Sequence, residues 1–63
     1  MSNQQTNKES KFLNAKDIAS ILDISESSAY RIIRKLNEEL TQQGKIVIAG
    51  KISRRYFEEK SYM

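Results

Sequence analysis

The sequence predicts a mainly α-helical fold with one small β-hairpin, in a single domain formed by a chain of 63 residues. Two stretches, 14–22 and 26–43, carry apolar side chains at the spacing of amphipathic helices. A β-branched segment at 45–49 precedes Gly50 and suits a strand that enters a turn. A domain this short buries only about 60% of the surface that its unfolded chain exposes. We therefore expect a small core shared by a few short elements.

The first predicted helix begins after Asn14 and ends at Asp23. Asn14 is a favourable N-cap, and Asp17 follows it three residues later, as in a typical helix start. The apolar side chains that follow form one stripe at i, i+3 and i+4 spacing: Ile18, Ala19, Ile21 and Leu22. Aspartate tolerates left-handed backbone geometry, so Asp23 suits a turn, and Ser25 is a second N-cap candidate. Two helices are thus expected to meet across about three residues.

The second predicted helix is longer and spans residues 26–43. Its apolar positions keep helical spacing: Ala29, Ile32, Ile33, Leu36 and Leu40. The opposite face is polar: Ser27, Arg31, Arg34 and Glu38. Gly44 then supplies a C-terminal stop, because glycine readily adopts the left-handed conformation that ends many helices.

Beyond this helix, the sequence predicts a hairpin and a short closing helix. Residues 45–49 form the first strand of the hairpin, which ends at a Gly50-Lys51 turn, and Ile52 lies on the returning strand. Ser53 then caps a terminal helix at 54–60.

The small and apolar side chains match a helix-turn-helix. Such a motif needs a small residue in its first helix, because the second helix crosses close by, and apolar anchors around the turn. Five side chains meet these needs: Ala19, Leu22, Ile24, Ala29 and Ile32. Over residues 11–62 the chain resembles the compact excisionase-like, MerR-like helix-turn-helix proteins of Gram-positive phages, plasmids and integrative elements, through AKDIASILDISESSAYRIIRKLNEEL and GKIVIAGKISRRYFEE.

This resemblance implies a winged helix-turn-helix that binds a defined site on double-stranded DNA. The second helix would enter the major groove, and the strand-turn segment would form a wing over the DNA backbone. The positions that match the DNA-reading face are Ser25, Ser27, Ser28, Tyr30, Arg31 and Arg34. The chain departs from the pattern at Asp23, where many such proteins have a glycine that suits positive φ, but aspartate is an acceptable substitute.

Basic charge is confined mainly to two segments of a chain whose formal net charge is +3. Residues 27–37 contain no acid, and Lys35 joins the two arginines of the second helix as a candidate DNA contact. Residues 44–57 also lack acids and supply the candidate phosphate contacts of the wing: Lys45, Lys51, Arg54 and Arg55. Phosphate contacts add sequence-independent affinity that weakens with salt. The alternative is that these four side chains belong to a solvated turn and contact no phosphate.

Arg31 and Arg34 are the candidates for sequence specificity. One arginine presents two donors to O6 and N7 of guanine, and a good bidentate pair discriminates between bases by about 1–3 kcal/mol, whereas a serine makes one short contact. The alternative is an ordinary solvated ion pair, since Glu38 lies four residues beyond Arg34. For Tyr30, contact with a phosphate or sugar and half-buried packing both remain open.

The composition disfavours several other classes of function. The chain has no cysteine and no histidine, so it lacks thiolate metal ligands and the side chain that most easily transfers protons near neutral pH. We find no nucleophile-base set or phosphate loop and expect neither an enzyme nor a cofactor. The longest apolar run, 46–49, is far below the roughly 20 residues of a membrane span, and the polar start is unlike a signal peptide.

We therefore expect a cytoplasmic protein with a disordered N-terminal arm at 1–10 and one DNA-binding domain at 11–63. Its expected role is sequence-specific DNA binding by a mobile-element protein, either an excisionase-type architectural factor or a transcriptional regulator. Double-stranded DNA is the expected partner, alongside a recombinase or integrase, or self-association on DNA, with no membrane partner. The alternative is a protein-protein interaction module, such as an antirepressor or recombinase partner, because a fold alone does not determine function.

Overall fold

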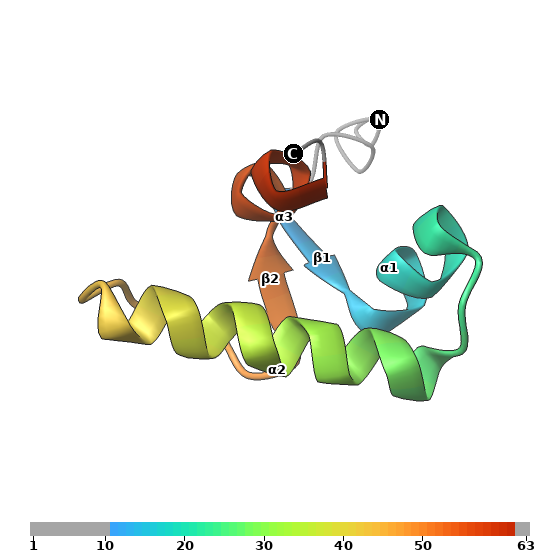
Figure 1. Cartoon of the computed structure of the whole chain (residues 1–63), viewed down its shortest axis with the longest axis horizontal. Helices are drawn as coiled ribbons and strands as arrows, with labels where there is room; N and C mark the ends of the chain where they lie inside the picture. The colour runs from blue at the N-terminus through green and yellow to red at the C-terminus, as the bar shows by residue number, and fades with distance from the viewer. Residues whose placement is uncertain (1–10, 62–63) are drawn as a thin grey trace, which may run out of the picture.

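The computed structural model of the chain describes residues 11–61. Its elements, in chain order, are β1 (Phe12–Asn14), α1 (Ala15–Leu22), α2 (Glu26–Gln42), β2 (Lys51–Ser53) and α3 (Arg54–Ser61). Figure 1 shows α1 beside the N-terminal end of the long helix α2, with β2 running from α2 toward α3 and β1 running the opposite way, from α3 toward α1. The predicted fold class, mainly α-helical with a small β-hairpin, is confirmed in its helices and in having two antiparallel strands, although β1 takes the place of the predicted first strand. The predicted arm at 1–10 lies outside the described residues.

All three predicted N-caps are present, including Ser53, whose Oγ accepts a hydrogen bond from the N–H of Tyr56 at 3.2 Å at the start of α3. The side chain of Asn14 accepts a hydrogen bond from the backbone N–H of Asp17 at 2.9 Å, and the Asp17 carboxylate accepts one from the Asn14 N–H at 3.0 Å. This reciprocal pair is a complete capping box at the start of α1. At the start of α2, Ser25 Oγ accepts from the N–H of Ser28 at 3.1 Å. Between the helices, Asp23 adopts the expected left-handed conformation, with φ of 58° and ψ of 50°.

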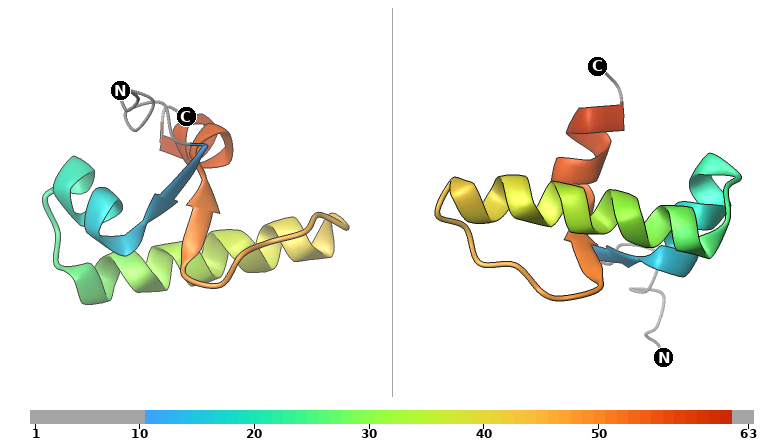
Figure 2. Two further views of the ribbon diagram at one scale, coloured as in Figure 1. Left: turned by 180° about the vertical axis from the view of Figure 1, so that it is seen from behind. Right: turned by 60° about the horizontal axis from the view of Figure 1, so that its bottom comes forward.

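The C-terminus of α2 ends in a Schellman motif centred on Gly44. The N–H of Gly44 donates to the carbonyl of Thr41, and the N–H of Lys45 donates to the carbonyl of Leu40, both at 2.9 Å. Gly44 has a φ of 84°, which side chains with a Cβ atom rarely adopt. The predicted stop at Gly44 is therefore confirmed. From there the chain runs back to β2 as a loop beside the C-terminal half of α2 (Figure 2).

The predicted strand at 45–49 is wrong. The segment has no regular structure up to Ile48, and a turn at Ala49-Gly50 follows, one residue earlier than predicted. The N–H of Lys51 closes this turn by donating to the carbonyl of Ile48 at 3.1 Å. The β-branched composition was misleading because Ile46 is 95% exposed. The segment therefore has no buried face of the kind that stabilises a strand.

The strand that pairs with β2 comes from the other end of the described chain. β1 and β2 are antiparallel, with Leu13 opposite Ile52. Both side chains are buried, at 2% and 0% exposure, so this pairing adds two apolar groups to the core. The prediction that Ile52 lies on a strand is correct. Its partner was missed because the apolar pair Phe12-Leu13 gave no local sign of a pairing nearly forty residues away.

The core lies where the sheet meets the inner faces of the three helices. Its largest fully buried side chains come from three elements: Ile18 of α1, Ile33 of α2 and Ile52 of β2. Phe57 of α3 is also part of this cluster. The core therefore fixes α2 against the rest of the domain while leaving one whole side of that helix free. Among residues 11–61, no helix combines the length and apolar character needed to cross a membrane.

Candidate nucleic-acid interface

Small side chains allow α1 and α2 to pack closely, as a helix-turn-helix requires. Ala29 is fully buried, and Ala19 and Ile24 are partly buried against the core. The N–H of Ile24 donates to the carbonyl of Ala19 at 3.0 Å and closes the end of α1. Leu22, predicted as an apolar anchor, is an exception at 40% exposed. The other predicted anchors hold α2 at a defined angle, with its polar side facing outward.

Arg31 and Arg34 lie on the side of α2 that faces away from the core, and both are exposed. Three residues apart on a helix, they are neighbours on one face. The ion pairs found within residues 11–61 involve other cations: Arg54, Arg55 and Lys60. The alternative pairing of Arg34 with Glu38 is therefore not formed. Both guanidinium groups are available to an anionic or hydrogen-bond-accepting partner.

The three candidate serines differ in their surroundings. Ser25 caps α2 through its bond with the Ser28 N–H, and its hydroxyl also donates to Ser28 Oγ at 3.1 Å. These two hydroxyls are thus already used in ordering the start of the helix. Ser27 is exposed on the same side of α2 as Arg31. Of the three, Ser27 has the hydroxyl best placed to contact a partner.

Tyr30 and Lys35 lie on the two flanks of this arginine face. Tyr30 is 56% exposed, and a Cβ atom on Gly50 would lie only 3.8 Å from Cε1 of its ring. The ring therefore stands beside the turn that precedes β2, which excludes burial in the core. Lys35 is exposed and close enough to Glu39 to contribute, as the smallest cause, to the lowered pKa of that carboxyl group.

The four basic residues predicted on the wing do not form one unit. Lys45 is exposed on the loop and Lys51 is exposed at the start of β2. Arg54 and Arg55 form the first turn of α3, which confirms the terminal helix predicted at 54–60, and each lies 3.8 Å from a glutamate one turn further on. The predicted hairpin of residues 45–49 with the strand of Ile52 is not formed, because β2 pairs with β1. The loop, defined as residues 45–50, carries one of these cations, and Lys51 directly follows it.

A groove of about 820 Å³ lies between α2 and the loop. Tyr30, Arg34 and Asn37 line it from the helix, and Val47 and Gly50 line it from the loop. Asn37 was missed by the sequence analysis. Its amide Nδ2 donates to the backbone carbonyls of Ile48, at 3.2 Å, and of Lys51, at 2.8 Å. Nothing in the local sequence marks this role, since both acceptors are backbone atoms of a segment more than ten residues away.

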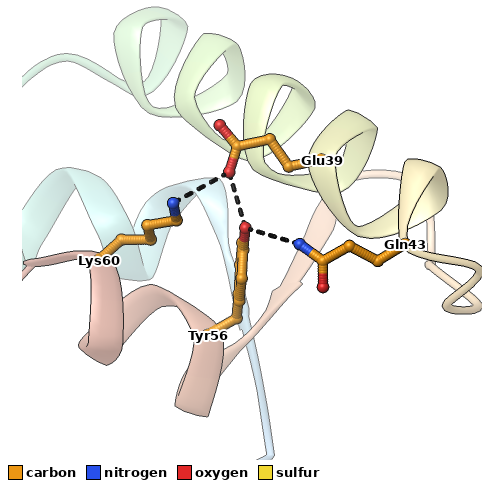
Figure 3. Close-up of polar contacts among 4 residues, drawn as sticks. All are labelled: Glu39, Gln43, Tyr56 and Lys60. Atoms are coloured by element: carbon orange, nitrogen blue, oxygen red, sulfur yellow. Dashed lines mark hydrogen bonds and ion pairs between the residues drawn. The ribbon is translucent and has the colours of Figure 1, made fainter.

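On the other side of α2, a polar cluster fastens α3 to the helix (Figure 3). The Tyr56 hydroxyl donates to Glu39 Oε1 at 2.7 Å, and Lys60 Nζ lies 3.5 Å from the same oxygen. Gln43 Nε2 lies 3.5 Å from the Tyr56 hydroxyl, at the long limit of a hydrogen bond. The hydrogen bond from Tyr56 and the charge of Lys60 hold the pKa of Glu39 below its ordinary value. Glu39 therefore serves the fold and does not oppose Arg31 or Arg34.

Two comparisons relate this chain to known proteins. The family model described as the Mga helix-turn-helix domain matches residues 5–60. The ICEBs1 excisionase of Bacillus subtilis (strain 168) is 48% identical over 48 residues, which cover 76% of this chain and 75% of that protein. No solved structure matches the chain significantly. The family match and the excisionase relative together show that this chain belongs to the Mga helix-turn-helix domain family, among the excisionase-like helix-turn-helix proteins.

Proposed function

We propose that this protein binds a defined site on double-stranded DNA by inserting α2 into the major groove. The observation that supports this most directly is the pair of exposed arginines, Arg31 and Arg34, on the outer face of the second helix of a helix-turn-helix. No acid within the described chain pairs with either guanidinium at salt-bridge distance. Each is therefore free to donate two hydrogen bonds to the O6 and N7 atoms of a guanine.

Affinity would come from a second set of contacts to the DNA backbone. Lys45 begins the loop that lines the groove and Lys51 directly follows it; both are exposed and suit phosphate binding, while Ser27 and Tyr30 suit short contacts at the edge of the DNA groove. Arg55 is a weaker candidate, because it lies on α3 opposite Glu59. Specificity and affinity would thus reside in different elements, since phosphate contacts position a protein and base contacts select the sequence.

We further propose that the role on DNA is that of an excisionase, as in the relative named ICEBs1 excisionase. Such a factor needs no catalytic group of its own, because a separate recombinase would perform the chemistry. A transcriptional regulator is the second candidate, since the family description names only a helix-turn-helix domain. The protein-protein interaction module is not favoured by either comparison.

The test is a binding experiment with purified full-length protein. Fragments of host DNA that the protein retains would be sequenced, and affinity for the recovered site would be measured by fluorescence anisotropy. Arg31→Ala with Arg34→Ala should abolish the preference for that site over scrambled DNA. Lys11→Ala with Lys16→Ala removes the same charge from exposed residues outside α2 and should keep the preference. Equal selectivity in the arginine variant and the wild type would disprove base contact by these residues.

The recovered fragments also separate the two roles. An excisionase site should lie at the ends of an integrated element, and adding the protein should increase excision by the cognate recombinase. Recovery only of promoter sequences, with no effect on excision, would instead support the regulator.

A further inference from the structure

Asn37 connects the middle of α2 to the loop at 45–50. Its single amide nitrogen donates to two backbone carbonyls, those of Ile48 and Lys51, and so uses both of its hydrogens. These carbonyls are the first and last of the turn that the Lys51 N–H closes. The side chain therefore holds both ends of that turn against the helix.

The loop has little else to hold it in place. It forms no strand, and within residues 11–61 Asn37 is the only side chain found to hydrogen bond to it. Apolar packing is limited to the partly buried Val47, because Ile46 is 95% exposed and Ile48 is 45% exposed. The Schellman bonds fix only its beginning, at Lys45. At the far end, where the chain enters β2, Asn37 supplies the side-chain hydrogen bonds that tie the turn to α2.

We infer that Asn37 is a positioning residue of the DNA interface, an inference that rests on the proposed function. It lies one turn beyond Arg34 on α2, and both residues line the groove between the helix and the loop. By fixing the turn, Asn37 helps to set where Lys51 stands relative to Arg34, together with the pairing of Lys51 with Asn14 in the sheet. The phosphate contact and the base contact are then held at one spacing before DNA binds.

This arrangement lowers the cost of binding. If the loop moved freely, DNA would have to order it, at a cost in entropy, before Lys45 and Lys51 could contact phosphates. A loop left unordered would lose these phosphate contacts, and affinity would fall. Asparagine suits the task because it supplies two donors from one atom. An aspartate of the same shape would supply none and would place a negative charge against two carbonyl oxygens.

The test compares Asn37→Ala with the wild type on the DNA site recovered above, across a range of salt concentrations. Affinity should fall roughly tenfold, as expected when a binding loop must be ordered. The slope of log affinity against log salt should become shallower by about 1–2, since each lost phosphate contact removes about 0.9. Preference for the site over scrambled DNA should remain, because Arg31 and Arg34 are untouched. Ser20→Ala, a polar truncation on the exposed part of α1, should leave every value unchanged.

A double-mutant cycle distinguishes positioning from a general loss of stability. If Asn37 acts through Lys51, then Lys51→Ala should cost much less affinity in the Asn37→Ala background than in the wild type. Additive losses, or an unchanged salt slope in a folded Asn37→Ala protein, would overturn the inference. Failure of the proposed function gives a different result, because the wild type itself would then show no preference for any site.

Discussion

The hydroxyl of Tyr56 on α3 and the carboxylate of Glu39 on α2 form a hydrogen bond of 2.7 Å. The same carboxylate oxygen lies 3.5 Å from Lys60 Nζ, so Glu39 contacts two side chains of α3, one through a hydrogen bond and one through an ion pair. Only Phe57 of that helix is fully part of the buried core. The Glu39 cluster therefore supplements a small apolar contact and helps fix α3 to the helix that carries the arginines.

Tyr56→Phe should lower the free energy of unfolding by about 0.5–1.5 kcal/mol, the usual net value of one hydrogen bond. The aromatic ring and its packing are retained, so the loss isolates the hydroxyl. In a domain of this size, a loss of 1 kcal/mol lowers the melting temperature by roughly 4–8 °C, which circular dichroism measures. Tyr30→Phe is the matched control, because that exposed hydroxyl forms none of the hydrogen bonds found in residues 11–61. Equal melting of both variants would contradict a structural role for the Tyr56 hydroxyl.

The same cluster predicts how stability depends on pH. The Tyr56 hydrogen bond, followed by the charge of Lys60, lowers the pKa of Glu39 below its ordinary value of 4.5. The pKa of Glu39 is thus lower in the folded protein than in the unfolded chain. Its charge therefore stabilises the fold fully above pH 4.5, and this stabilisation is lost as the pH falls through the pKa that Glu39 has in the folded protein. The charge of Glu39 raises the pKa of Lys60 above 10.5. The charge of Lys60 therefore stabilises the fold fully below pH 10.5, and this stabilisation is lost as the pH rises through the pKa that Lys60 has in the folded protein.

Melting curves of the wild type and of Glu39→Gln, recorded from acidic to alkaline pH, check this prediction. The wild type should melt at a higher temperature across the neutral range, and the two curves should converge at low pH, where Glu39 is protonated. They should also approach each other at high pH, as Lys60 loses its charge. A constant difference at every pH would show that Glu39 acts through packing and not through its charge.

The local signals in the sequence predicted the helices well. Asn14, Ser25 and Gly44 mark helix ends through bonds to backbone groups within a few residues, so their roles can be recognised from the sequence alone. The exposed arginines were predicted for the same reason, since helical spacing assigns them a face opposite Ala29.

The features that were missed all depend on contacts between distant parts of the chain. Leu13 pairs with Ile52 across most of the domain, and no local pattern selects that partner over the β-branched segment that precedes the turn. Asn37 bonds to carbonyls, which every residue possesses, so its acceptors carry no signature in the sequence. The groove follows from both of these contacts and was therefore not predicted either.

The corrected strand pairing predicts opposite behaviour for two isoleucines. Ile52→Ala removes a fully buried side chain opposite Leu13 and should cost about 2–5 kcal/mol, enough to leave a marginally stable small domain largely unfolded. Ile46→Ala truncates a side chain that is 95% exposed and should change stability by less than about 0.5 kcal/mol. Chemical denaturation measures both. Severe destabilisation by Ile46→Ala would indicate that residues 45–49 form a buried strand after all.

The left-handed conformation of Asp23 predicts which substitutions the inter-helix turn accepts. Asp23→Val forces a β-branched side chain into a φ of 58° and should lower the free energy of unfolding by roughly 1–2 kcal/mol. Asp23→Gly relieves the steric cost but gains backbone freedom in the unfolded chain, so its net effect should stay within about 0.5 kcal/mol. Thermal melting measures both variants. A Val variant as stable as the Gly variant would contradict the left-handed geometry.

Replacement by lysine separates the charge of Arg34 from its geometry. Arg34→Lys keeps the positive charge but loses the two fixed donors that match a guanine. Affinity for scrambled DNA and the salt dependence of binding should therefore remain close to the wild-type values, while discrimination between the recovered site and one altered at a guanine should fall by about 1–3 kcal/mol. Binding measured on both oligonucleotides gives this difference directly. Arg55→Lys, on α3 beside Glu59, is the matched control and should change neither value. If Arg34→Lys instead discriminates as well as the wild type, Arg34 contacts phosphate and Arg31 alone remains as the arginine that selects the sequence.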